Sequence, residues 1–175
     1  MSDSLRQIQC RFSRQDDRVL LEVTTRMHDA YRLWLTRRFV KLFWEKLVGN
    51  LERSPEVAAQ PAKRSRRAVM AFQKQEAVSK ANFATAPEPE EELTYPLGDT
   101  PLLPTKFTLG EKKDGFMPVT FETADGTNVA LGLNRDQLYS VCHLLVSAVA
   151  KSDWDLDLRI DEDPRQGVPP KQHLH

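Results

Sequence analysis

Cysteine is scarce in this sequence, with two residues among 175, and so is glycine, with seven. Cys10 and Cys142 stand far apart and outside any metal-ligand spacing, which favours reduced thiols in the core of a cytoplasmic protein. The sequence contains no glycine-rich loop that could cradle a phosphate, no GxSxG motif and no HExxH motif. We therefore expect a non-enzymatic protein without a cofactor, a bound metal or a small-molecule substrate.

Long apolar runs are also missing. The first residues, MSDSLRQIQCRF, contain no stretch of signal-peptide length, and no window approaches the roughly 18 apolar residues of a membrane span. Hydrophobic residues make up 40% of the chain and charged residues 29%, as in ordinary soluble domains. These features predict a cytoplasmic protein that does not associate with membranes.

Neither charge is in excess, since the chain has 25 basic and 25 acidic residues, but the two signs are unevenly placed. Residues 1–75 contain 16 Lys and Arg against 8 Asp and Glu, whereas residues 76–175 contain 9 against 17. A neutral protein has no long-range attraction to polyanions, which favours two halves that attract each other, within one chain or between two. The basic half could instead carry a nucleic-acid surface.

What the sequence does contain is an internal repeat of its apolar pattern, with almost no identical letters. From Val19 to Gly49 the pattern recurs 98 residues later without a gap. Two alternating runs, typical of half-buried strands, lead in each copy to an N-cap residue, Thr36 or Asn134. An apolar helix stripe at i, i+3, i+4, i+7 spacing follows. It consists of Val40, Phe43, Trp44 and Leu47 in the first copy and of Leu138, Val141, Cys142 and Leu145 in the second.

One more alternating run precedes each copy, at residues 8–12 and 107–109. Each copy therefore reads as strand, strand, strand, helix, although this order is common and binary patterning alone could produce the match. We predict an α+β fold made of two pseudo-symmetric βββα units with antiparallel sheets. The sequence leaves open whether the two sheets join edge to edge or stack face to face.

The predicted organisation has five parts. They are a first unit at 1–53, a basic helical arm at 54–84, an extended linker rich in proline and acids at 85–104, a second unit with an added edge strand at 105–160, and a disordered tail at 161–175. The arm begins with Ser54 as N-cap and Pro55 as first helical residue, and Pro61 marks a kink or a restart. The edge strand is predicted from WDLDLRI, where large apolar residues alternate with acids.

Candidate binding residues come from one side of the first sheet and from the arm. Because Tyr31, Leu33 and Leu35 alternate toward the core, Arg32 and Trp34 face the other side. Gln9, Arg11, Arg18 and Leu20 of the neighbouring strands share this outer side. Arginines and an aromatic ring on an exposed sheet are typical of surfaces that bind single-stranded nucleic acid. The candidate set is Arg11, Arg18, Arg32, Trp34, Arg64, Arg66 and Arg67.

A second interpretation is contact with protein. The matching face of the second copy carries small residues, Ala130 and Gly132 among them, which suit packing against the arm or against another chain. We expect a homodimer or another protein partner, with the basic arm of one chain against the acidic segment of the other; nucleic-acid binding is the alternative. The repeat also aligns Phe39 with Gln137, which predicts a position outside the core, whereas Tyr31, Phe43 and Trp44 align with apolar residues and are predicted to be buried.

The repeated order of antiparallel strands and a helix resembles the architecture of the Whirly and PUR-repeat single-strand nucleic-acid-binding proteins, over residues 5–50 and 105–160. This chain has three strands per unit where that architecture has four. The resemblance implies binding of single-stranded nucleic acid and assigns no residue a role. The segments RLWLTRRFV and PLGDTPLL are similar to those of a group of small bacterial proteins of unassigned function, which implies a bacterial origin.

Overall fold

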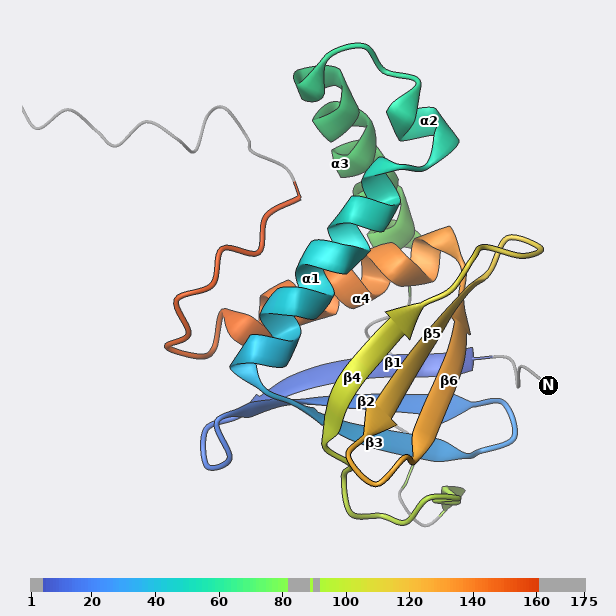
Figure 1. Cartoon of the computed structure of the whole chain (residues 1–175), viewed down its shortest axis with the longest axis vertical. Coiled ribbons are helices and arrows are strands. Elements are labelled where there is room, and N and C mark those ends of the chain that lie inside the picture. The colour runs from blue at the N-terminus through green and yellow to red at the C-terminus, as the bar shows by residue number, and fades with distance from the viewer. Residues whose placement is uncertain (1–4, 82–88, 90–91, 161–175) are drawn as a thin grey trace, which may run out of the picture.

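The computed structural model describes residues 5–81, 89 and 92–160. Its elements are β1 (Leu5–Ser13), β2 (Arg18–Thr25), β3 (Ala30–Leu35), α1 (Arg37–Glu52), α2 (Pro55–Ala58), α3 (Lys63–Lys80), β4 (Pro104–Leu109), β5 (Met117–Thr123), β6 (Asn128–Leu133) and α4 (Arg135–Val149). Two antiparallel sheets, β1-β2-β3 and β4-β5-β6, are each followed by helices (Figure 1). The predicted α+β fold with two βββα units is confirmed.

The two units agree in register as well as in order. In β2 and β3, Val19 lies opposite Leu35, and in β5 and β6 the residues 98 positions later, Met117 and Leu133, lie opposite each other. The N-caps predicted for the two copies, Thr36 and Asn134, are confirmed, whereas Ser54 occupies the N-cap position of α2 without a side-chain capping hydrogen bond. The Thr36 side chain accepts a hydrogen bond from the amide of Phe39 at 3.2 Å, and the Asn134 side chain accepts one from the amide of Gln137 at 2.8 Å.

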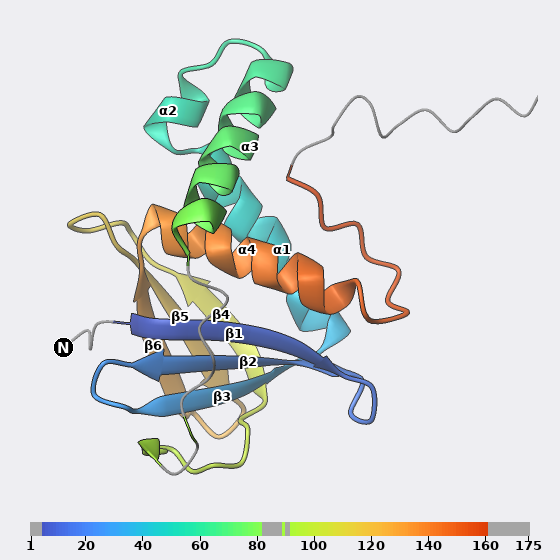
Figure 2. The same ribbon diagram turned by 180° about the vertical axis from the view of Figure 1, so that it is seen from behind.

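The helices are exchanged between the two sheets. Helix α1, which follows the first sheet, contacts β4 of the second, whereas α4, which follows the second sheet, packs on β1 and β2 of the first. The strands of the two sheets run in different directions (Figures 1 and 2). Apolar residues of both sheets and both helices form one hydrophobic core. The relation of the units is therefore neither simple edge pairing nor simple stacking, because each unit is completed by the other unit's helix.

Phe39 corrects one prediction from the repeat, because it is only 6% exposed. Its ring meets those of Phe107 and Phe121 in the second sheet. The equivalent Gln137 instead accepts a hydrogen bond from the amide of Asn134. Equivalent helix positions have different surroundings because α1 and α4 pack on different sheets. Phe43 and Trp44 are buried as predicted, whereas Tyr31 is half-buried.

The segment after α4 corrects a second prediction, because the WDLDLRI residues form no strand. Its apolar residues do turn inward, and Leu158 and Ile160 are buried. The Trp154 ring meets Phe12 edge-on with centroids 5.4 Å apart, and Arg37 donates a hydrogen bond to the carbonyl of Asp155 at 3.4 Å. Alternation indicates an extended chain with one apolar side. The alternation does not indicate whether the apolar side of the chain packs on a sheet or, as here, mainly on helices.

The arm consists of two helices. α2 ends at Ala58 and α3 begins at Lys63, so the restart predicted at Pro61 is confirmed. α3 packs on α4, where the Tyr139 hydroxyl donates a buried hydrogen bond to the Gln73 side chain at 2.8 Å. The other end of α3 and the short α2 project beyond the two sheets (Figure 1).

The described part of the linker follows the open edge of the first sheet. The amide of Ala30 donates to the carbonyl of Thr94 at 2.8 Å, and the amide of Trp34 donates to the carbonyl of Leu102 at 2.7 Å. These bonds satisfy backbone groups that an edge strand otherwise leaves unpaired. The predicted tail at 161–175 and part of the linker lie outside the described residues.

Candidate binding surface

The outer side of the first sheet is less open than the alternation implies. Cross-strand register places Arg11, Leu20 and Trp34 in one row. Arg11 is exposed and Trp34 half-buried, but Leu20 is only 6% exposed, and Thr24 further along β2 is buried too. The central strand is therefore covered at these positions, and what this row offers is the exposed Arg11 on β1 and part of the Trp34 ring on β3, with Leu20 between them.

Arg32 binds within its own chain. Its side chain donates to a carboxylate oxygen of Glu22 at 2.6 Å and to the hydroxyl of Tyr95 at 2.9 Å. The guanidinium also lies over the Tyr95 ring, 4.7 Å from its centroid. An arginine that is charge-paired, hydrogen-bonded and stacked has an evident structural role. It fastens the linker to β3.

The other predicted arginines do not join the sheet residues in one surface. Arg18 is half-buried at the start of β2, and Arg64 is exposed on the first turn of α3. Arg66 donates to the carbonyl of Gln60 at 3.2 Å and so closes the turn between α2 and α3, while Arg67 is half-buried. The beginning of α3 and the first sheet lie at opposite ends of the molecule (Figures 1 and 2).

A basic surface that the sequence analysis did not select lies on the first two turns of α1. It consists of Arg37, Arg38, Lys41 and Leu42, and we call it the α1 surface. All four side chains are exposed, and Leu42 is 44% exposed. Within the part of the chain that the structure describes, Arg38 and Lys41 have no hydrogen-bond or ion-pair partner. The signal in the sequence was the string RRFVKL directly after the Thr36 cap, which places basic side chains in the first turns of a helix.

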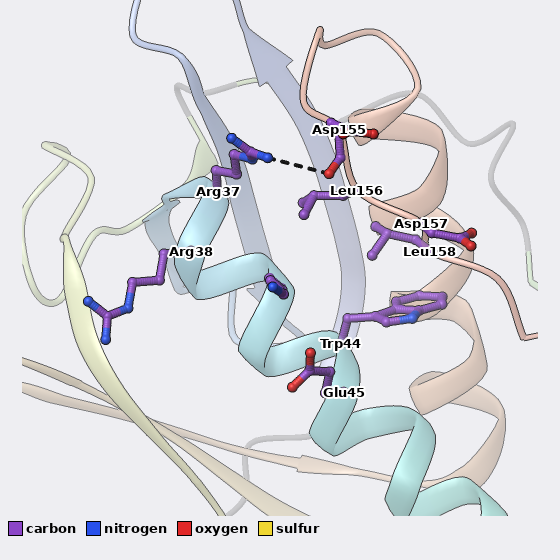
Figure 3. Close-up of a pocket in the computed structure, with 9 residues that line it drawn as sticks. Arg37, Arg38, Trp44, Glu45, Asp155, Leu156, Asp157 and Leu158 are labelled. Carbon is purple, nitrogen blue, oxygen red and sulfur yellow. Dashed lines mark hydrogen bonds between the residues drawn. The ribbon is translucent and has the colours of Figure 1, made fainter.

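Two hollows flank the α1 surface. The first, of about 450 Å³, lies between α1 and residues 155–158, with Trp44 in its wall (Figure 3). The second, of about 500 Å³, lies between α1 and β4, and we call it the α1–β4 groove. Arg38 lines both, and its side chain extends away from Asp155 and Asp157 (Figure 3).

The second unit provides an internal comparison for these charges. Arg37, Arg38, Lys41 and Leu42 correspond to Arg135, Asp136, Tyr139 and Ser140. In α4, Arg135 is paired with Asp136 at 3.2 Å and with Glu76 at 3.4 Å. α1 has no acid in its first turn. The helix dipole makes a cation at a helix N-terminus unfavourable by about 0.3–1 kcal/mol. The start of α1 is therefore less stable than it would be with an acid in the first turn, as in α4.

Cys142 and the Tyr139 phenol are buried, and Cys10 is half-buried. Burial raises the pKa of both Cys10 and Cys142 to about 12, so both remain protonated near neutral pH and are poor nucleophiles. Burial also raises the pKa of Tyr139, with a smaller contribution from Cys142. It lowers the pKa of His143, with Lys74 acting in the same direction. None of these four groups lies on the α1 surface, which offers charged and apolar side chains.

Among the described residues, no group of three or more His, Cys, Asp or Glu side chains is arranged to hold a metal ion. No helix in that part of the chain has the length and apolarity needed to cross a bilayer. No protein-family model, no curated protein and no solved structure matches the chain. The function therefore has to be inferred from the geometry of this molecule.

Proposed function

We propose that this protein is a non-enzymatic binding or assembly protein that contacts another protein chain, a second copy included, through the α1 surface. The supporting observation is that Arg38, at the positive end of the α1 dipole, and Lys41, in the next turn, have side chains without partners among the described residues and lie beside the exposed Leu42. Residues that oppose local stability and have no internal role are typical of functional surfaces.

The composition of the α1 surface suits a protein partner. Arginine is one of the residues enriched at protein interfaces, and an apolar contact ringed by polar groups excludes water from its centre. The chain also offers complementary charge for self-association. Asp153, Asp155 and Asp157 are exposed. Two copies could therefore bring the α1 surface of one against the acidic segment of the other.

Light scattering over a wide range of protein concentration tests this proposal. We expect the mean mass to rise with concentration and to fall with added salt, because screening weakens contacts between exposed charges. Arg38→Asp, which copies the charge found at Asp136 of the second unit, should weaken association. Lys112→Asp makes the same change of charge on an exposed loop outside both hollows and is the matched control. A monomeric mass at every concentration excludes a second copy as the partner, and equal effects of the two substitutions contradict a role of the α1 surface.

A second candidate function is the binding of single-stranded nucleic acid. Its support is the row in which the half-buried Trp34 ring and the exposed Arg11 lie on either side of Leu20. Stacking on Trp34 should quench tryptophan fluorescence when oligothymidine is added, with an affinity that falls as salt rises. Trp34→Leu should remove the quenching and Arg11→Ala should weaken binding. Unchanged fluorescence and no binding at low salt would exclude this function.

A further inference from the structure

The α1–β4 groove has an apolar floor that is open to solvent. Its apolar lining includes the rings of Phe39 and Phe107 and the side chains of Leu42 and Leu103. Leu42 is 44% and Leu103 40% exposed, so two of the six most exposed large apolar residues in the described chain line this one groove. Paired exposed leucines over an aromatic base are a contact surface for an apolar side chain.

The charge of the groove has one sign. Arg38 on the helix and Lys106 on the strand line it, and no carboxylate of the described residues does. Lys106 is 69% exposed and its nearest acid, Glu122, is 3.9 Å away, a distance at which an exposed pair contributes little. A ligand of this groove should therefore carry negative charge on both sides of an apolar centre.

One wall of the groove is an open strand edge. The amide of Gly110 donates to the carbonyl of Pro118 at 2.8 Å, so residues in phase with Gly110 bond toward β5. Backbone groups alternate in direction along a strand, which turns those of Phe107 and Leu109 away from β5. β4 is the edge strand of the described second sheet, and neither residue makes a described backbone hydrogen bond outside the pairing of β4 with β5. An extended chain that adds to β4 would satisfy these groups.

On its other flank, α1 packs against a segment of its own chain, residues 153–160. Residues 153–160 lie there in extended form, with Asp155 and Asp157 exposed and Leu156 and Leu158 turned toward the helices (Figure 3). The contact joins a cation of the first turn, Arg37, to an acidic backbone segment. The α1–β4 groove repeats this combination of cations and apolar floor on the opposite flank, and adds the strand edge.

We propose that the α1–β4 groove binds an extended segment of a partner protein in which acidic residues alternate with large apolar residues. The segment adds to β4 through the backbone of Phe107 and Leu109. Its apolar side chains rest on Leu42 and Leu103, and its carboxylates meet Arg38 and Lys106. This inference rests on the proposed protein-binding function and names the ligand class.

A labelled synthetic peptide with the sequence of residues 153–160, DWDLDLRI, is a suitable probe for the full-length protein. We expect saturable binding by fluorescence polarisation, weakened at least tenfold by Lys106→Glu and by Leu103→Ser. Lys112→Glu and Leu97→Ser are the matched controls, since Lys112 and Leu97 are also exposed but lie outside the groove, and they should leave affinity unchanged. Lys106 is so exposed that its substitution tests the groove even if Leu103→Ser lowers stability.

Two further measurements identify the mode and the class of ligand. Strand addition should slow hydrogen exchange at the amides of Phe107 and Leu109 when the peptide binds. A peptide of the same composition with its three aspartates placed together should bind more weakly, because it cannot alternate its two sides.

Three results overturn the inference: no peptide binding, equal loss in the control variants, or oligothymidine that binds the same groove more tightly. If light scattering still shows association that Arg38→Asp weakens while the peptide fails to bind, the ligand class is wrong and the protein-binding function stands. If neither association nor peptide binding is observed, the proposed protein-binding function is wrong as well.

Discussion

At the scale of single residues, Phe39 joins the two units. It is on α1, yet its ring lies 5.3 Å from that of Phe107 and 6.0 Å from that of Phe121 in the second sheet. Phe43, one turn later, meets the same two rings at 5.1 and 5.4 Å. Tilted and edge-to-face contacts of this kind stabilise beyond the area they bury.

Truncation of Phe39 should therefore strongly lower the stability of the protein. We expect Phe39→Ala to lower the free energy of unfolding by about 3–5 kcal/mol, the usual effect of emptying a buried aromatic site. Urea unfolding followed by circular dichroism measures it. Phe72→Ala is the control, since Phe72 is 67% exposed on α3 and its truncation should change stability by no more than about 0.5 kcal/mol. Equal losses would place Phe39 outside the core.

At the scale of elements, α1 and α4 are equivalent helices with opposite charge at their beginnings. α4 has a complete capping box and Asp136 in its first turn. α1 has the Thr36 cap but begins with Arg37 and Arg38. Both helices are held by their apolar faces, so α1 can retain an unfavourable N-terminal charge at a small cost in stability.

Arg38→Asp should therefore stabilise the protein. The exchange of a repelled cation for an attracted anion at the N-terminus is expected to add about 0.5–2 kcal/mol. For a chain of this size that raises Tm by roughly 1–8 °C, measured by calorimetry. The gain should shrink in high salt. A higher Tm together with weaker association would show that Arg38 serves binding at a cost to stability. A lower Tm would show that Arg38 stabilises its own chain.

The β5–β6 hairpin should be sensitive to acid. The Asp125 carboxylate accepts hydrogen bonds from the Thr123 hydroxyl and from the amide of Thr127, and these bonds lower its pKa to about 2. The unfolded value is about 3.9, so the contribution is complete above about pH 4 and is lost as the pH falls toward 2. Urea midpoints of the protein and of Asp125→Asn should converge over that interval. A constant difference would contradict the assignment.

At the scale of the whole molecule, the exchange of helices makes the two units interdependent. α1 supplies Phe39 and Phe43 to the second sheet, and α4 covers the first. α3 is tied to α4 in turn by the Tyr139–Gln73 hydrogen bond. Neither unit has a core of its own, because the buried residues form one connected cluster.

Unfolding should accordingly be a single transition. Far-ultraviolet circular dichroism and tryptophan fluorescence should give coincident urea curves, because Trp44 in α1 and Trp154 beyond α4 report on opposite ends of the chain within the same core. Residues 1–53 expressed alone should lack a cooperative transition, since α1 then has no second sheet to cover. Two separated transitions, or a folded fragment, would show that the units are autonomous.

The sequence by itself determined the six strands of the two sheets, the helices α1 and α4 with their N-caps, and the repeat. Each of these depends on contacts between near neighbours, such as the Thr36 and Asn134 caps, or on periodicity along one element. The break between α2 and α3 at Pro61 is equally local, because proline lacks the backbone N–H that would hydrogen-bond within the preceding helical turn.

Only the tertiary structure decided which sheet each helix covers, and through this the burial of Phe39, the course of residues 153–160 along the helices and the position of the α1–β4 groove. Apolar periodicity indicates that a face is covered but carries no information about the element that covers it. For the same reason Arg32, which looked available for binding, is held by Glu22 and Tyr95, while the exposed Arg38 and Leu42 were not selected. Whether a charged side chain is satisfied depends on residues distant in the chain, and these are brought to it only by the fold.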